Sequence, residues 1–333
     1  MGNILTFGEL LLRLTPPNKQ RINQANSYHS FFGGAEANVA INLSRYGHDT
    51  SLFTALPKND VGDAAIMTLK SAGVDTSFIH RFGDRLGLYF YEEGFSVKQP
   101  QVVYDRKNAS FLELAEKTID WDTIFLEKDV IHLTGITPAL NEEMRIFTID
   151  VIKEAKQRNV TISFDFNYRS KLWSIDEARE VYIALLPYVD ICFMGHKDLA
   201  VFLGMGASNA FDETLLKKHY RDVAKAYDIE YLACTNRTVV SQSKNELSGY
   251  LYHSEHFVES DCQSFDVLER IGGGDAFASG ILHGILTDMT LEKTVEFGIA
   301  SSVLKHTVYG DYTQYSVEEV KSFMHSNDQD VIR

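Results

Sequence analysis

The sequence predicts an α/β protein with a mostly parallel sheet, helices on both faces of that sheet, and a small β-strand lid. Strand-like and helix-like segments alternate from one end of the 333-residue chain to the other. The strand-like segments are apolar throughout, as expected for strands buried on both faces. Two stretches break the alternation, at about 11–32 and 86–107, and we expect them to form the lid. No linker rich in Pro, Gly or Ser divides residues 1–333, so a single domain is predicted.

Short apolar segments are expected to form the main sheet. They are 4–10, 51–56, 129–135, 161–167, 190–195 and 231–235. Open parallel sheets bind their ligands outside the carboxyl ends of the strands. The functional site should therefore be built from the loops that follow these segments.

The clearest helical period lies in 140–155. Leu140, Met144 and Phe147 recur at three- and four-residue spacing, and charged residues occupy the other face. Asn141 is a suitable N-cap for this helix, because its side-chain oxygen can accept from a backbone N–H of the first turn.

Two further helical patterns follow near the C-terminus, at 290–306 and 316–326. They open on Thr290 and Ser316, and each has an acid in its first turn. The tail after Asn327 is expected to fray.

The lid is predicted from a strand pattern. Segments 87–94 (GLYFYEEG) and 101–106 (QVVYDR) are typical of a hairpin of exposed, aromatic-rich strands, and 11–32 has no helical period. An uncovered strand edge is a liability for a monomer. We therefore expect a homo-oligomer that forms through the lid.

Composition narrows the class of partner. The formal net charge is -14, whereas binding to nucleic acid or to an anionic membrane needs a basic surface. We expect neither of those partners, and a small-molecule ligand fits better.

The remaining features of the chain indicate a cytoplasmic protein. Cys192, Cys234 and Cys262 have neither the number nor the spacing of a disulfide framework or a zinc site. The N-terminal segment carries Glu9 and Arg13, so it resembles a first strand more than a signal peptide. No segment approaches the roughly 20 apolar residues of a membrane span.

The stretch RIGGGDAFASG (270–280) carries the strongest chemical signal. Its glycines run into a helical pattern, and a helix N-terminus preceded by bare backbone forms an anion site. Asp275 could simply cap that helix. In the functional interpretation, Gly272, Gly273 and Gly274 hold a phosphoryl group as negative charge develops, and Asp275 takes the proton from an attacking hydroxyl. The chain has no Walker-type phosphate loop that could serve instead.

A second glycine pair, Gly33 and Gly34, opens an earlier helix in 31–47. Glycine permits close approach of a ligand, and Asn38, one turn into the helix, can hydrogen-bond a polyhydroxy compound. A glycine turn before a packed helix can also be purely structural.

The two glycine motifs together resemble the signatures of a known family. GGAEANVA (33–40) and IGGGDAFASG (271–280) are similar to the first and second signatures of the ribokinase-like (PfkB) carbohydrate kinases. The resemblance implies a ribokinase-like fold. It further implies that Asp275 is the catalytic base, that Gly272 to Gly274 form the anion hole, and that ATP with Mg²⁺ donates the phosphoryl group. A monovalent-cation effect is also open.

Within that family, several segments are most similar to the 2-keto-3-deoxygluconate kinases. They are HLTGITPAL (132–140), DFNYRSKLW (165–173), GLYFYEEG (87–94), YDR (104–106) and YGD (309–311). The resemblance implies that the sugar-acid pocket is lined by Gly34, Asn38, Tyr89, Tyr104, Arg106, Arg169, Asp275 and Asp311. Two arginines suit a carboxylate substrate, because a guanidinium matches a carboxylate in geometry and charge. Each of the pocket residues could instead pack or solvate the lid and strand ends.

The nucleotide side matches the family less well. The resemblance assigns to it Asn167, Asp198, Thr235 and Arg237, together with Gly272 and Gly274. Asp198 stands where the family has a glutamate, so a metal would be held through water if at all. In the loop TNRTVV (235–240), Arg237 and Val240 replace glycines. This departure leaves the nucleotide preference open.

Arg270 is the residue for which the family pattern offers no guide. The family often has Asp-Thr-Thr where this chain has Glu269, Arg270 and Ile271. Arg270 could meet phosphate, or it could be a surface charge.

The sequence thus predicts a kinase that phosphorylates the terminal hydroxyl of 2-keto-3-deoxy-D-gluconate, giving the 6-phosphate. The alternatives are a neutral-sugar kinase of the fructokinase or ribokinase type, a nucleoside kinase of the same fold, and a non-catalytic sugar-acid sensor. The gluconate and galactonate series differ at one hydroxyl, and the sequence does not separate them.

Overall fold

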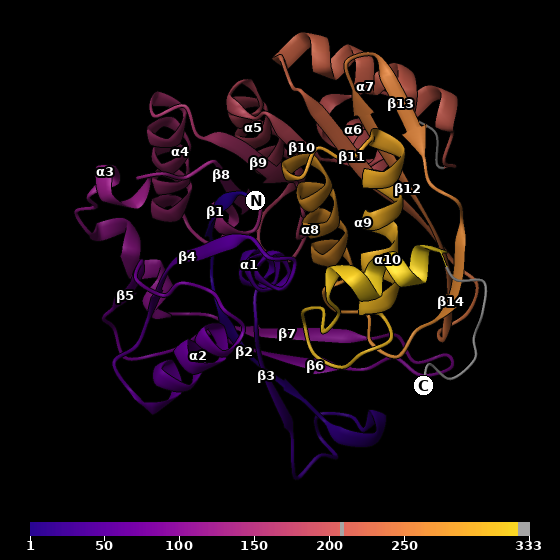
Figure 1. Cartoon of the computed structure of the whole chain (residues 1–333). Coiled ribbons are helices and arrows are strands. Elements are labelled where there is room, and N and C mark those ends of the chain that lie inside the picture. The colour runs from indigo at the N-terminus through magenta and orange to yellow at the C-terminus, as the bar shows by residue number, and fades with distance from the viewer. Residues whose placement is uncertain (207–209, 326–333) are drawn as a thin grey trace.

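The main sheet of the protein is mostly parallel and lies between two layers of helices. The computed structural model describes residues 1–206 and 210–325 (Figure 1), so the tail expected to fray lies outside the described residues. The sheet has ten strands in the order β13-β12-β11-β10-β9-β8-β1-β4-β5, and β14 also pairs with β12. The strands are β1 (Asn3–Phe7), β4 (Asp49–Leu56), β5 (Ile79–Arg81), β8 (Val130–Thr134), β9 (Thr161–Asp165), β10 (Ile191–Phe193), β11 (Tyr231–Val239), β12 (Lys244–His253), β13 (His256–Glu259) and β14 (Gln263–Asp266). The predicted α/β class is confirmed.

The six predicted strands correspond to β1, β4, β8, β9, β10 and β11, which pair in parallel. Beyond β11 the sheet becomes antiparallel, and β12 to β14 were not predicted. The predicted loop 235–240 is wrong, because β11 continues through it to Val239. Backbone pairing with β12 extends from Tyr231↔His253 to Val239↔Asn245, and this ladder imposes the extended conformation.

Helices cover both faces of the sheet, as predicted. They are α1 (Ala35–Arg45), α2 (Asp60–Ser71), α3 (Trp121–Ile124), α4 (Glu142–Gln157), α5 (Ile175–Leu185), α6 (His196–Leu203), α7 (Glu213–Tyr227), α8 (Gly273–Leu286), α9 (Leu291–Lys305) and α10 (Val317–His325). Residues of α4 to α7 share one buried apolar cluster with the sheet, and residues of α1, α8, α9 and α10 share another. None of the helices among the described residues is long and apolar enough to cross a membrane.

The predicted caps are present. The side chain of Asn141 accepts from the Met144 backbone N–H at 2.7 Å, and Thr290 accepts from the Lys293 N–H at 3.4 Å. Ser316 accepts from the Glu319 N–H at 3.3 Å. Local side-chain chemistry therefore sets where these helices begin.

A separate four-stranded sheet has the order β3-β2-β6-β7, with β2 (Leu11–Thr15), β3 (His29–Gly33), β6 (Leu88–Glu92) and β7 (Gln101–Asp105). In Figure 1 it lies below the main body, near the loops that follow the central strands. Both stretches that lack the β-α alternation supply its strands, and β6 and β7 form the predicted antiparallel hairpin.

The expectation that the aromatic strands are exposed is wrong for one face of this sheet. Tyr89 and Tyr91 are buried against Leu11, with Tyr104 and Ile271 packed beside them. Alternation along the strand explains the difference, since successive side chains point to opposite faces. The inner face is therefore buried around Tyr89 and Tyr91, while the exposed Val103 lies on the outer face.

Close packing fixes the position of α8, whose N-terminus belongs to the candidate site. A Cβ atom at Gly280 would lie 2.6 Å from the Cα of Gly298 on α9, so the two helices touch at their backbones. On the other side, Asn42 of α1 donates to the Ser279 hydroxyl at 3.1 Å. The second turn of α8 is therefore held by two neighbouring helices.

Candidate active site

The three glycines of the turn before α8 differ in what a side chain at each position would contact. Gly272 has φ 82°, and a Cβ there would lie 1.7 Å from the Asp311 carbonyl oxygen. A Cβ at Gly273 would lie 2.3 Å from the His306 ring. Around Gly274, in contrast, nothing lies within 4 Å of an added Cβ. Packing demands the first two glycines, whereas Gly274 faces open space at the positive end of the helix dipole.

The backbone that leads into this turn is held by the carboxylate of Glu269. Its Oε1 accepts from the backbone N–H groups of Arg270 at 3.0 Å and of Ile271 at 3.3 Å. The backbone N–H groups of Leu268 and Glu269 both donate to the His306 carbonyl. The whole segment is therefore fixed before the glycines begin.

A buried ion network connects this segment to the small sheet. Arg13 of β2 is fully buried and donates to Glu269 and, at 2.7 Å, to Oδ1 of Asp311. The hydroxyl of Tyr89 donates to the other oxygen of Asp311. Asp311 and Tyr89, both expected to contact substrate, thus also bind each other.

Sequence reasoning missed Arg13 and Glu269 as parts of the site. Arg13 could have been noticed as a charged residue within the apolar strand Leu11–Thr15. It lies two residues from both Leu11 and Thr15, so its side chain points to the same buried face as theirs. No sequence pattern indicates the role of Glu269. Its side-chain partner, Arg13, is 256 residues away, and its other partners are backbone N–H groups of the residues that follow it.

Asp275 lies in the first turn of α8 and has the environment of a general base. Burial raises the pKa of its carboxyl to about 6, against the lowering effects of a hydrogen bond from Asn38 and the charge of Arg169. The Nδ2 of Asn38 donates to Asp275 Oδ2 at 2.7 Å. Asn38, which we expected to bind substrate, therefore also orients the aspartate.

The expected substrate residues all line one cavity of about 270 Å³. They are Gly34, Asn38, Tyr89, Tyr104, Arg106, Arg169, Asp275 and Asp311, and Gly272 to Gly274 line it too. The residues come from the small sheet, from the start of α1, from the segment after β9, from the glycine turn with the first turn of α8, and from the segment between α9 and α10. Gly34 serves packing as well, since a Cβ there would lie 2.0 Å from the Glu9 carbonyl oxygen.

Three arginines line this cavity, and two of them, Arg106 and Arg169, retain hydrogen-bonding capacity. Arg106 lies 3.3 Å from Glu9 Oε2 and stacks on Tyr104, yet its Nε and Nη1 make no hydrogen bond within the described chain. Arg169 donates only to the backbone carbonyls of Asn167 and Tyr168. A buried guanidinium with unused donors favours an anionic ligand.

Three further carboxyl groups near the cavity have raised pKa values because they are buried. The pKa of Asp165, at the end of β9, rises to about 8, with the charge of Asp275 as the second cause. Burial likewise raises the pKa of Glu9 and of Glu36 to about 7. Asp165 and Asp275 thus favour different protonation states within one site, and Asp275 is the one that ionises first.

A second cavity, of about 410 Å³, adjoins the other side of the glycine turn. Asp198, Thr235, Arg237 and Gly274 line it, as expected for the nucleotide side, while Asn167 and Gly272 line the substrate-side cavity instead. Gly273 and Gly274 line both cavities, so the turn stands between the two.

Asp198 is used locally as a helix cap. Its Oδ2 accepts from the Gly195 N–H at 2.8 Å, and burial raises the pKa of its carboxyl to about 6. No group of three or more His, Cys, Asp or Glu side chains among the described residues is arranged to hold a metal ion.

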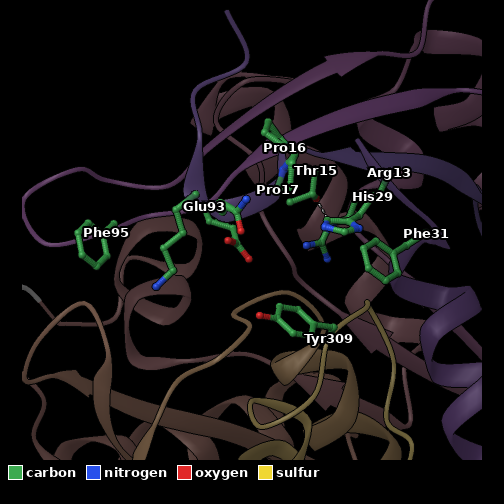
Figure 2. Close-up of a pocket in the computed structure, with 11 residues that line it drawn as sticks. Arg13, Thr15, Pro16, Pro17, His29, Phe31, Glu93, Phe95 and Tyr309 are labelled. Carbon is green, nitrogen blue, oxygen red and sulfur yellow. Dashed lines mark hydrogen bonds between the residues drawn. The ribbon is translucent and has the colours of Figure 1, made fainter. Parts of the chain in front are cut away.

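Another cavity, of about 640 Å³, shares no lining residue with the substrate-side cavity. Figure 2 shows Tyr309 across it from Thr15, His29 and Phe31 of the small sheet, with Glu93 and Phe95 at its side. The buried Arg13 forms part of its wall.

Comparison with known proteins agrees with this arrangement. The family model described as pfkB family carbohydrate kinase matches residues 1–318. The chain is 30% identical over 332 residues to a 2-dehydro-3-deoxygalactonokinase of Haloferax volcanii, covering 100% of this chain and 99% of the relative. It is 31% identical over 315 residues to a 2-dehydro-3-deoxygluconokinase of Bacillus subtilis, covering 92% and 90% of the two chains.

A solved structure gives the same result. The 2-dehydro-3-deoxygluconokinase of Thermotoga maritima is 35% identical and superposes with a TM-score of 0.93, covering 98% of this chain and 100% of that one. Fold and sequence agree along nearly the whole chain, which belongs to the pfkB family of carbohydrate kinases.

Proposed function

We propose that this kinase phosphorylates the terminal hydroxyl of a 2-keto-3-deoxy sugar acid, with 2-keto-3-deoxy-D-gluconate as the first candidate. The observation that carries the proposal is the presence of Arg106 and Arg169, with unused donors, in the same cavity as Asp275. A carboxylate substrate would satisfy both guanidinium groups, whereas a neutral sugar would leave them unpaired. The names of the relatives support this class and include both the gluconate and the galactonate series.

In the proposed reaction, Asp275 accepts the proton of the terminal hydroxyl as its oxygen bonds to the γ-phosphorus of ATP. The bond between that phosphorus and the oxygen of the leaving ADP breaks. Backbone N–H groups at Gly273 and Gly274 would hold the phosphoryl oxygens, helped by the dipole of α8. Asn38 keeps the carboxylate aimed at the hydroxyl.

The nucleotide-side cavity is better suited to bind a triphosphate than to hold a metal ion coordinated entirely by protein side chains. Lys197, Arg237 and Arg270 line it, and open space adjoins Gly274. Mg²⁺ when bound would neutralise phosphate charge, and it is usually held by substrate phosphates and water with only one or two carboxylates. Asp198 is the carboxyl on this side that would reach it through water. A buried lysine, Lys305, lies near Gly272, and an effect of an added monovalent cation stays a prediction.

We further propose that the chain acts as a single domain in which the small sheet is a lid. Closure of the lid would exclude water that otherwise hydrolyses ATP. Dependence on ATP, together with three unpaired cysteines, favours a cytoplasmic location.

The central test measures ADP release with keto-deoxy acids of both series, fructose, ribose and nucleosides. We expect turnover with a keto-deoxy acid, and kcat about 10²–10⁴-fold lower in Asp275→Asn because the base is lost. Activity should fall as the pH drops through about 6, where Asp275 takes up its proton. Activity confined to neutral sugars or nucleosides would overturn the substrate, and ligand binding without turnover would indicate a sensor.

The arginines can be tested through discrimination between acceptors. Arg106→Met and Arg169→Met should each lower kcat/KM for the sugar acid by about 10–100-fold, because a hydrogen bond to a charged group is lost. Residual phosphorylation of fructose should change little in Arg106→Met. For Arg169→Met the two acceptors are compared well above pH 6, because Arg169 also lowers the pKa of Asp275. An equal loss with both acceptors would contradict a role in binding the carboxylate.

Gly274 offers a test of the anion hole that leaves the fold intact. Gly274→Ala should keep or slightly raise the free energy of unfolding, by up to about 1 kcal/mol, since the helix gains an alanine and nothing is displaced. Phosphoryl transfer should fall by about 100-fold, because the methyl group occupies the space for phosphoryl oxygens. Gly272→Ala is the contrasting variant and should lose stability, measured by denaturant titration. Full activity in Gly274→Ala would remove this turn from the reaction.

We propose that the small sheet also forms a homodimer. Its edges β3 and β7 have no further strand paired with them within the described chain, and its outer face carries Val103, 50% exposed, beside the half-buried Leu14 and Phe90. Uncovered edges and apolar faces are usually buried in assemblies.

Light scattering after size exclusion should give twice the chain mass of 37.7 kDa for the wild type and a single chain mass for Val103→Asp. Ile146→Asp, on the exposed face of α4, is the matched control and should not change the mass. A monomeric wild type would refute the dimer.

A further inference from the structure

Arg270 lies where three cavities of the site meet. It lines the substrate-side cavity, the nucleotide-side cavity, and a third space between the β6–β7 turn and the Ser241–Ser243 turn. No other described residue lines all three of these cavities. The glycine turn that begins two residues later faces the first two.

The backbone and the tip of Arg270 are both held. Its N–H donates to Glu269, which is itself bound to the buried Arg13. Its Nη2 donates to the Gln242 carbonyl at 2.8 Å. The guanidinium is therefore positioned at the boundary between the cavities before any ligand is present.

The charge of Arg270 is not neutralised by these contacts. Within the described chain no acidic side chain forms an ion pair with Arg270 or with Arg237, and no side-chain hydrogen bond is made by Arg237. Both arginines line the nucleotide-side cavity, and burial together with the charge of Arg270 lowers the pKa of Arg237. The pKa of the nearby His306 is also lowered, chiefly by burial and also by Lys305, Arg237 and Arg270.

Two guanidinium groups that repel each other at the edge of a cavity favour a ligand with several negative charges. Only a polyanion offsets both charges at once. Because Arg270 alone of the pair also lines the substrate-side cavity, it is the one placed along the path between donor and acceptor.

We propose that Arg270 is a catalytic residue that contacts the transferring phosphoryl group, while Arg237 contacts the phosphates that remain on the donor. This inference rests on the proposed phosphoryl transfer. Arg270 would stabilise the charge on the equatorial oxygens as the bond to the donor breaks, together with the N–H groups of the glycine turn. The two carbonyl contacts of Arg270 keep the guanidinium pre-oriented and do not compete for its charge.

Steady-state kinetics with Arg270→Gln, Arg237→Gln and Arg45→Gln separate the roles. Arg270→Gln should lower kcat by about 100-fold or more and leave KM for the sugar acid within about threefold. Arg237→Gln should mainly raise KM for ATP. Arg45, an exposed arginine bound to Gln314 at 3.0 Å, is the matched control and should leave both constants unchanged.

Calorimetry distinguishes a catalytic role of Arg270 from a purely structural one. ADP alone should bind to Arg270→Gln within about threefold of its wild-type affinity, whereas ADP with aluminium fluoride and the acceptor should bind about 100-fold more weakly. Equal weakening of both complexes, or a kcat within about threefold of wild type, would overturn the proposal.

The acceptor in these measurements is whichever compound the wild type phosphorylates. If that compound is a neutral sugar, the proposed substrate is wrong and the comparison for Arg270 still holds. Absence of turnover with every acceptor contradicts both proposals.

Discussion

The buried ion network of Arg13, Glu269 and Asp311 is the interaction on which the rest of the site depends. One carboxylate oxygen of Glu269 binds Arg13, and the other accepts hydrogen bonds from the two backbone N–H groups that precede the glycine turn. Asp311 binds Arg13 and Tyr89 through its side chain. Its backbone carbonyl packs so closely against Gly272 that no side chain fits there. One arginine thus joins the small sheet to the turn. Losing one partner of such a buried pair typically costs about 3–5 kcal/mol, because the remaining charge is left unpaired.

Beside this network, the two adjoining cavities contain positive charges that no acidic side chain fully neutralises. The chain as a whole has a formal charge of -14, yet the arginines that line the two adjoining cavities are incompletely neutralised. Arg106 has one carboxylate nearby, and Arg169, Arg237 and Arg270 have no acidic ion-pair partner among the described residues. Arginines without an ion-pair partner at a cavity of an otherwise acidic protein direct anionic ligands to that cavity. Both a sugar acid and a polyphosphate fit that pattern.

Most of the main sheet and the glycine turn could be predicted from the sequence, because their signals are local. Apolar runs identify strands buried on both faces, and N-cap residues mark the helix starts. The strand β11 was predicted too short, since its last residues are polar and become a strand only through pairing with β12. The inward-facing tyrosines of β6 were expected to be exposed, because nothing in that strand says what covers it.

The sequence by itself determined the class of fold, the anion-binding turn with its aspartate, and a set of residues that resembles a sugar-acid pocket. Only the tertiary structure decided that Asn38 and Arg169 act on Asp275, that Arg13 and Glu269 support the turn, and that Arg270 lies at the junction of the cavities. The physical reason is distance along the chain. The Asn38–Asp275 bond joins residues 237 apart, and the Arg13–Asp311 pair joins residues 298 apart. Hydrogen bonds and ion pairs of this span leave no periodic or neighbouring pattern in the sequence.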